Sequence, residues 1–239
     1  MISFFIPIKK ISRRVRKKNI RKIFNYKFGL TEIKILQLLK FKKIVTKDSV
    51  LKKRKFEFII SSDDPKIENY LKKYSWIKFN KRPKSLSTDD CLDELVKYVP
   101  KICSGDLIIW THVTSPFFDH QSYKYFIKKF LEKKNIYDSA FTAEEIKSFI
   151  YNFNKSKWIS HDASKKKWPR TQDLEKIYKI NHAAFIAKRK VYEKLGDRIG
   201  LKPLPIENKK KIENFDIDEH KDFNLFKKII KKNNEIYKN

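Results

Sequence analysis

Cysteine and glycine are both scarce in this sequence of 239 residues. Its two cysteines, Cys91 and Cys103, are too few for a disulfide framework or a cysteine-rich zinc site, which predicts a protein of a reducing compartment, the cytoplasm. With four glycines and eight prolines, the chain is neither collagen-like nor of low complexity, and it lacks the glycine-rich phosphate-binding loop motif. The five histidines have no metal-ligand spacing, and no Ser-His-Asp or Cys-His nucleophile pattern is present.

Long apolar runs are absent as well. The N-terminal run over residues 2–8 is interrupted by Ser3 and is far shorter than the ~20 residues that a membrane-spanning helix needs. It also lacks the basic flank and the cleavage site of a signal peptide. We therefore expect no membrane insertion, and the run predicts a buried first strand.

Acidic residues are few relative to basic ones. The sequence has 57 Lys and Arg against 28 Asp and Glu, which gives a formal net charge of +29. Such an excess attracts polyanions, for example nucleic acid, an anionic membrane or a polyphosphate substrate. Because the lysines are spread over the whole chain instead of forming one basic tail, the charge does not choose among these partners. Nucleic-acid binding therefore stays open as an alternative function.

Short apolar runs alternate with helical segments over the first half of the chain. This alternation is typical of βαβ units, and it predicts an α/β fold of three layers, Rossmann-like, in which helices cover both faces of a mostly parallel sheet. The strands are expected at residues 2–8, 56–60, 76–79 and 106–110. The helices are expected over residues 31–43, over 65–74, after a cap at Asp89, and after a cap at Asp119.

The pattern changes after about residue 137. Residues 137–187 hold short β-like pieces at 139–142, 148–153 and 183–187, which predict a small β-rich lobe and a contact surface. The α/β core then consists of residues 1–136 and 188–239, with closing helices over 188–195 and 219–231. Ligands bind at the carboxyl ends of strands in such sheets, so five loops are the expected functional ones. These loops are residues 9–19, 61–64, 81–89, 111–116 and 216–218.

A cationic loop follows directly on the first strand. Cations at a strand's carboxyl end suit a nucleoside triphosphate, which carries about four negative charges, because Lys acts as a point charge and Arg as a bidentate fork. A solvated basic loop or a patch for RNA explains the same residues equally well. The cations are Lys9, Lys10, Arg13, Arg14, Arg16, Lys17 and Lys18.

Two carboxylates, Asp216 and Asp218, stand two residues apart near the C-terminus. On a strand end they would lie on the same side, ~6–7 Å apart along the backbone, and both could reach one hard cation. Mg²⁺ prefers one or two carboxylates together with substrate phosphate oxygens, so the pair is a candidate magnesium site. Asp218 could equally cap the last helix, and the two roles are compatible.

Three further segments carry weaker signals. Arg82-Pro83 lies between a strand and a helix, where an Arg fork and a rigid turn would face the ligand edge of the sheet, although a simple turn and cap explains it as well. The segment 114–116 follows the strand at 106–110. Arg170, Gln172 and Asn181 form a polar group in the β-rich lobe that could recognise a carboxylate and hydroxyls, or be a surface turn.

Taken in order, these segments resemble the acylneuraminate cytidylyltransferase family, the CMP-sialic acid synthetases and their relatives. The resemblance runs from Ile6 to about Ile230, and the order of the matches is far more specific than any one of them. The matching residues are Ile6-Pro7 to Ser12 with Lys18-Asn19, then Arg82-Pro83 with Leu86-Ser87 and Asp89, Thr114 to Pro116, Arg170 with Gln172 to Leu174 and Asn181, and Asp216 to Asp218 with Asp222-Phe223.

The resemblance implies a nucleotidyltransferase fold and a reaction in which CTP and an acidic sugar give a CMP-sugar and pyrophosphate. The anomeric hydroxyl of a 2-keto acid sugar would attack the α-phosphorus of CTP. Lys18, Asp216 and Asp218 would be the catalytic residues, with Mg²⁺ on the two aspartates. Nucleotide binding falls to Lys9, Ser12, Arg13, Lys18, Asn19, Arg82 and Ser87. Sugar binding falls to His112, Arg170, Gln172, Asn181 and Phe185, and the β-rich lobe would form a homodimer and contribute to the partner's sugar site.

Several positions depart from the family pattern. Lys10 and Ile11 replace paired glycines of the first loop, which implies another loop path or weaker binding of CTP. His112-Val113 replaces Gln-Pro, Phe118 replaces an Arg, and His182 replaces a Gly. Three of these changes fall on the sugar side, so the residues do not define the exact sugar. Because both aspartates, Lys18 and Asn19 are retained, a divergent subfamily is expected rather than an inactive enzyme.

Overall fold

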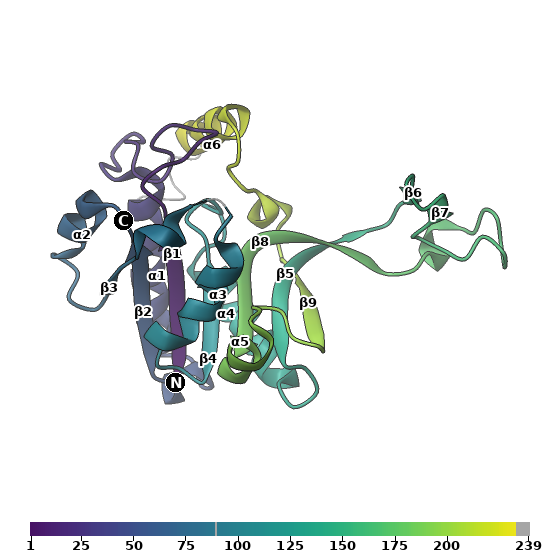
Figure 1. Ribbon diagram of the computed structural model, residues 1–239, viewed down its shortest axis with the longest axis horizontal. Helices are drawn as coiled ribbons and strands as arrows, with labels where there is room; N and C mark the ends of the chain where they lie inside the picture. The colour runs from purple at the N-terminus through teal and green to yellow at the C-terminus, as the bar shows by residue number, and fades with distance from the viewer. Residues whose placement is uncertain (89, 233–239) are drawn as a thin grey trace.

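We analysed a computed structural model that describes residues 1–88 and 90–232. Its centre is a seven-stranded sheet in the order β3-β2-β1-β4-β8-β5-β9 (Figure 1). β8 is antiparallel to both of its neighbours, and every other pair in the sheet is parallel, which confirms the mostly parallel α/β fold. The strands are β1 Ile2–Ile8, β2 Phe56–Ser62, β3 Lys78–Lys81, β4 Leu107–Thr111, β5 Ser139–Ile146, β8 Ile177–Lys188 and β9 Pro203–Glu207.

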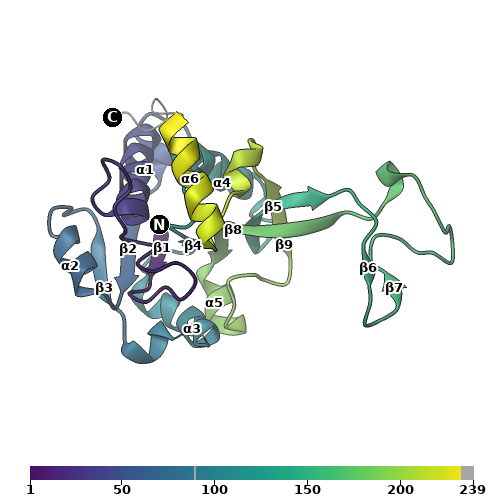
Figure 2. The same ribbon diagram turned by 90° about the horizontal axis from the view of Figure 1, so that it is seen from above.

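Helices cover both faces of this sheet (Figures 1 and 2). Buried residues of α1, α2, α4 and α6 pack on one face, and buried residues of α3 and α5 pack on the other. The helices are α1 Gly29–Val45, α2 Pro65–Leu71, α3 Leu92–Ile102, α4 His120–Lys133, α5 Arg189–Leu195 and α6 His220–Lys232. No helix among the described residues is both long enough and apolar enough to cross a membrane.

The central strand β1 shows why the sheet needs cover on both sides. Successive side chains of a strand point to opposite faces. Phe4 therefore packs on the face of α1 and α4, with its ring centroid 5.2 Å from that of Phe41 and 5.4 Å from that of Tyr123. Phe5 packs on the other face, 4.8 Å from Trp110 between centroids. A strand that is apolar on both faces fixes β1 in the middle of the sheet, so its carboxyl end opens between neighbouring loops.

The chain between β5 and β8 projects from the body of the protein as an arm (residues 147–176; Figure 1). The projecting part is shorter than the lobe expected over 137–187, because Ser139 to Phe141 and Ala184 to Lys188 pair inside the central sheet. The arm carries only two short strands, β6 Tyr151–Asn152 and β7 Lys157–Trp158, in place of the strand expected over 148–153. A small aromatic cluster holds it together, with Trp158 5.5 Å from Trp168 between ring centroids.

Three other expectations need correction or fall outside the structure. Residues 215–218, expected to be a strand end, form an irregular loop, because their backbone pairs with a loop instead of with a strand. The edge strand β9 was not expected from the sequence. Asp89, the expected cap of the third helix, lies outside the described residues, and α3 begins at Leu92. Asp119 does cap α4, where its side chain accepts hydrogen bonds from the backbone N–H groups of Gln121 and Ser122.

Candidate active site

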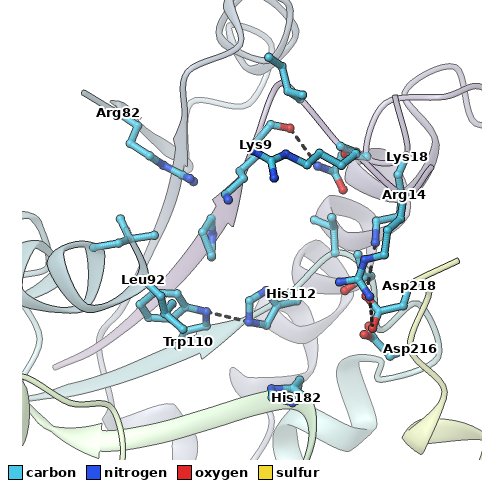
Figure 3. Close-up of a pocket in the computed structure, with 18 of the residues that line it drawn as sticks. Lys9, Arg14, Lys18, Arg82, Leu92, Trp110, His112, His182, Asp216 and Asp218 are labelled. Carbon is cyan, nitrogen blue, oxygen red and sulfur yellow. Dashed lines mark hydrogen bonds and ion pairs between the residues drawn. The ribbon is translucent and has the colours of Figure 1, made fainter. Parts of the chain in front are cut away.

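A cleft of about 550 Å³ opens where the carboxyl ends of β1 and β4 meet the loop before α6 (Figure 3). Three chain segments that are far apart in the sequence form its walls: the cationic loop after β1, the loop after β4, and residues 216–218. Nine of the fourteen predicted site residues line it, namely Lys9, Ser12, Arg13, Lys18, Asn19, Arg82, His112, Asp216 and Asp218. The cleft therefore lies at the edge of the sheet where ligands are expected in this class of fold.

The cationic loop is closed at its base by Asn19. The amide Nδ2 of Asn19 donates to the carbonyl oxygen of Lys9 at 3.0 Å, and the carbonyl oxygen of Asn19 accepts from the hydroxyl of Thr31 at 2.8 Å. Lys10 and Ile11, which replace the family's glycines, are not among the described non-glycine residues with positive φ. At these two positions the backbone therefore follows a path that side chains can adopt, whereas Lys17 of the same loop has a φ of +55°.

The C-terminal aspartates face this loop directly. Lys18 Nζ donates to the carbonyl oxygen of Ile217 at 2.5 Å and lies 3.8 Å from a carboxylate oxygen of Asp218. Arg14 Nη1 lies 3.1 Å from the other oxygen of Asp218. Figure 3 shows Lys18 and Arg14 descending toward the two aspartates. The two regions that the sequence analysis assigned to phosphate and metal thus share one cleft.

Asp216 is held from below by the loop after β4. Its Oδ1 accepts from Ser115 Oγ at 3.4 Å, and the next backbone N–H, of Ile217, donates to the carbonyl oxygen of Thr114 at 2.9 Å. Burial raises the pKa of the Asp216 carboxyl and the negative charge of Asp218 raises it further, while the Thr114 side chain and the Lys18 ammonium partly oppose this rise. A bound cation would relieve the cost of keeping two carboxylates charged side by side.

The donor set at Asp216 and Asp218 fits magnesium. Among the described residues no third His, Cys, Asp or Glu joins the pair to make a closed protein cage. Mg²⁺ rarely uses such a cage, because it keeps several waters and combines one or two carboxylates with phosphate oxygens of a substrate. An open pair of carboxylates beside a cationic loop has the chemistry that a magnesium–triphosphate complex requires.

A buried lysine supports the loop after β4 from inside the protein. Lys34 of α1 is 1% exposed, and its Nζ donates to the carbonyl oxygens of Ser115 and Phe118 and to the hydroxyl of Tyr123, at 3.0–3.1 Å. Burial lowers the pKa of Lys34 to about 7. Because Ser115 also contacts Asp216, Lys34 lies under the metal-binding candidate without facing the cleft.

Two histidines and an indole form the floor of the cleft. Trp110 Nε1 donates to Nε2 of His112 at 2.9 Å, which leaves the His112 proton on Nδ1. Burial lowers the pKa of His112 well below its ordinary value, so this imidazole is neutral. His182, at a position where the family has glycine, lines the same floor and adopts a left-handed backbone with φ of +61°.

Arg82 enters the cleft wall from the segment after β3. It is 3% exposed, and its Nη2 donates to the carbonyl oxygen of Ser61 at 2.5 Å. Its Nη1 has no hydrogen-bond partner within residues 1–88 and 90–232, which leaves a buried donor for a ligand. Ser87 does not line the cleft, and its hydroxyl donates to the carbonyl oxygen of Pro83 at 3.3 Å.

The remaining predicted sugar-binding residues lie elsewhere in this chain. Arg170 and Gln172 are exposed on the arm, where Arg170 Nε pairs with Asp173 at 2.8 Å. Asn181 is buried, accepts from Thr142 at 2.5 Å and donates to Asn214 at 2.8 Å, so it holds the local bend of β8. Phe185 is fully buried beneath the cleft floor.

Sequence reasoning gave no role to four residues that form or support the cleft: Trp110, His182, Lys34 and Arg198. Trp110 and Lys34 lie in segments correctly expected to be a strand and a helix, but their side-chain positions depend on tertiary packing. The family departure at His182 was the one available signal for that residue. Arg198 follows α5 in a segment without any motif, and it lines the cleft from there.

The sheet has a Rossmann-like nucleotidyltransferase fold, and the cleft lies at its ligand-binding edge. A model of the cytidylyltransferase family matches residues 4–239, and the chain belongs to that family. The sequence has no significant match among curated proteins.

Solved structures are similar over nearly the whole chain. One is 4-diphosphocytidyl-2C-methyl-D-erythritol synthase from Anaerococcus prevotii, with a TM-score of 0.62, 14% identity and 96% of each chain covered. A second is CMP:2-keto-3-deoxy-manno-octonic acid synthetase complexed with CTP, with a TM-score of 0.59, 13% identity, and coverage of 97% of this chain and 98% of that chain. A third is HddC from Yersinia pseudotuberculosis, with a TM-score of 0.54, 14% identity, and coverage of 96% and 100%. At these identities the likeness establishes the fold.

Proposed function

We propose that this cytidylyltransferase transfers CMP from CTP to the anomeric hydroxyl of an acidic sugar, a sialic acid-like nonulosonate or a related 2-keto acid, and releases pyrophosphate. The observation that carries the proposal is the meeting of Lys18 with Asp218 across one cleft, 3.8 Å apart. The similarity in fold to a CMP:2-keto-3-deoxy-manno-octonic acid synthetase supports the sugar class.

In this reaction an oxygen–phosphorus bond forms between the sugar hydroxyl and the α-phosphorus. The bond from the α-phosphorus to the β-phosphate oxygen breaks, pyrophosphate leaves, and the hydroxyl proton passes to solvent. Lys9, Arg13 and Lys18 would bind the phosphates and neutralise the charge that develops on the leaving group. Arg82 would hold the nucleotide with its unpartnered Nη1. The cleft therefore acts by positioning both substrates and by electrostatic stabilisation.

Asp216 and Asp218 would hold the magnesium ion, for which their open arrangement is suited. When bound there, Mg²⁺ supplies neutralisation of the triphosphate charge. Ser115 orients Asp216 by its hydrogen bond at 3.4 Å, and Lys18 keeps the segment 216–218 against the cationic loop through the carbonyl oxygen of Ile217.

We further propose a homodimer in which the arm reaches the cleft of a second copy. The support is the exposure of large apolar side chains on the arm, where Phe153 is 85% exposed and Trp168 is 65% exposed. Arg170 and Gln172, which are remote from the cleft of their own chain, would then belong to the sugar site of the partner. Sedimentation equilibrium of the wild type and of Phe153→Glu tests this, with a dimer and a monomer as the expected results.

Replacement of Asp218 by Asn tests the reaction. Pyrophosphate release from CTP and Mg²⁺ with a panel of acidic sugars should fall below about one thousandth of the wild-type rate, because a metal ion stabilises the transition state by several kcal/mol. Glu219→Gln is the matched control, since Glu219 is exposed beside it and pairs with Lys221. Unchanged turnover in Asp218→Asn would exclude the metal assignment. Tight, salt-dependent RNA binding without CTP turnover would favour the nucleic-acid alternative instead.

A further inference from the structure

Arg198 lines the cleft beside Trp110 of the cleft floor. The residue follows α5, and its guanidinium carbon is 4.0 Å from the ring centroid of Phe185 and 4.9 Å from that of Trp110. Stacking on two aromatic rings fixes the plane of a guanidinium and leaves its edge to make hydrogen bonds. Arg198 is thus a rigid cation in the wall of the cleft.

The negative charge of Asp197 acts on this cation but makes no ion pair with it. Among the described residues the Arg198 side chain has no ion pair and no hydrogen bond, and its Nη1 is a buried donor without a partner. Arg189, which lies at the start of the same helix α5, shows the usual arrangement. Its guanidinium donates to the carbonyl oxygens of Pro100, Cys103 and Gly105.

The histidines beside Arg198 supply no negative charge. His112 and His182 share the floor with it, burial lowers the pKa of both imidazoles, and the Arg198 charge lowers both further. The negative charges of Asp216 and Asp218 act in the opposite direction and raise the pKa of His182. An unpaired cation costs free energy when it is partly buried, and an anionic ligand of the cleft would remove that cost.

The position of Arg198 in the cleft indicates which part of the substrates it would bind. The triphosphate has its own cations at the other end of the cleft, in the loop 9–19, and Arg82 belongs to that end as well (Figure 3). Arg198 stacks on Trp110, which is hydrogen-bonded to His112, and Figure 3 shows these two residues on the side of the cleft away from Lys9 and Arg82. On that side the group that attacks the α-phosphorus would bind. A planar, bidentate carboxylate matches a guanidinium held edge-on in this way.

We propose that Arg198 is a specificity-determining residue that binds the carboxylate of the acceptor sugar. The inference deepens the proposed function and rests on it, because it assumes an acidic acceptor in this cleft. It also assigns the carboxylate to a residue of the same chain, independently of Arg170 on the arm.

Three variants and two probes test the inference. N-acetylneuraminic acid and 3-deoxy-manno-octulosonic acid are compared with their carboxamides in the wild type, Arg198→Gln and Arg198→Lys. In Arg198→Gln the KM for the acids should rise at least ~10-fold with the KM for CTP unchanged, and the preference for acid over amide should approach one, since the charge-assisted pair is lost. Arg198→Lys should restore part of the preference. Arg54→Gln, an exposed arginine before β2, is the control.

Calorimetry separates this inference from the proposed function. Binding of the same acids and amides is measured in the presence of Mg²⁺ and α,β-methylene CTP, so the result does not depend on turnover. Acid binding that weakens ~10-fold in Arg198→Gln supports the inference even if no CMP-sugar forms, an outcome that would contradict the proposed function. Turnover of an acid with the full acid preference kept in Arg198→Gln would overturn the inference and leave the proposed function standing. Absence of acid binding in the wild type would overturn both.

Discussion

The interior below the loop after β4 and the floor of the cleft each hold a cation away from bulk water, and the protein treats the two differently. Lys34, in the interior, is 1% exposed and donates three hydrogen bonds, to Ser115, Phe118 and Tyr123. Arg198, on the floor, stacks on two rings and has no hydrogen-bond partner among the described residues. Lys34 finds its hydrogen-bond partners within the protein, whereas Arg198 needs a bound ligand to supply one. Satisfied and unsatisfied charges thus distinguish structural from ligand-binding positions in this molecule.

The largest effect is expected from removing the interior cation. Lys34→Met leaves the buried carbonyl oxygens of Ser115 and Phe118 without their donor, and each buried acceptor left unsatisfied costs about 1–3 kcal/mol. Because the variant also removes the burial cost of the ammonium, we expect a net loss of about 2–3 kcal/mol in the free energy of unfolding, measured by urea titration at pH 7. A loss below about 0.5 kcal/mol would mean that the loop is held by other contacts.

We expect Lys34 also to make the free energy of unfolding depend on pH. Its pKa is about 7 in the folded protein, while the unfolded chain has the ordinary value of 10.5. Between these values the unfolded state binds the extra proton, so raising the pH favours the folded state. The difference in unfolding free energy between wild type and Lys34→Met should therefore grow with pH by on the order of 1 kcal/mol per unit from pH 7.5 to 9.5. A flat difference would show that Lys34 is not buried as a neutral amine.

On the cleft floor, the largest stability effect is expected at His182. Its φ of +61° is a conformation that a Cβ atom disfavours by about 1 kcal/mol or more, whereas glycine adopts it freely. We expect His182→Gly to raise the thermal midpoint, by an amount equivalent to about 0.5–1 kcal/mol because glycine also gains entropy in the unfolded state. Ala at the same position should give no such gain. A destabilised glycine variant would show that the imidazole contributes more than its backbone strain costs.

The smallest effect on folding is expected at Arg198 itself. Arg198→Met removes the cation–π contacts, each worth about 0.5–2 kcal/mol, and also removes the burial cost of an unpaired charge. These terms oppose each other, so the stability of the ligand-free protein should change by less than about 1 kcal/mol in urea titration. A loss as large as that of Lys34→Met would make Arg198 a structural residue and remove the contrast between the two regions.

The sequence predicted those parts of the fold that depend on local pattern. Apolar runs located β1, β2 and β4, and Asp119 capped α4 as expected. Pairing in space could not be inferred in this way, so the inner halves of β5 and β8 were assigned to a lobe although they lie in the central sheet. β9 was missed because Pro203 and Pro205 disfavour a strand, and it tolerates them as an edge strand that pairs with β5 alone.

The candidate site likewise combines residues that the sequence predicted with residues that only tertiary packing brings there. Lys9, Lys18, Asp216 and the other motif residues were found because the family resemblance preserves their order along the chain. A lysine in a helix is ordinarily expected to face solvent. Lys34 is buried because α1 packs against α4. Arg198 follows no motif, and its role depends on two aromatic rings, Phe185 and Trp110, that come from different strands of the sheet.

One continuous strand joins the arm to the floor of the cleft. β8 starts at Ile177, beside the arm, and reaches Asn181 and His182 four to five residues later in the strand Ile177–Lys188. Because a strand is stiff along its length, we expect a displacement of the arm to move the backbone around Asn181 before any other part of the cleft. Binding of a second molecule to the arm would then change the geometry of the acceptor-binding part of the cleft without changing the phosphate-binding part.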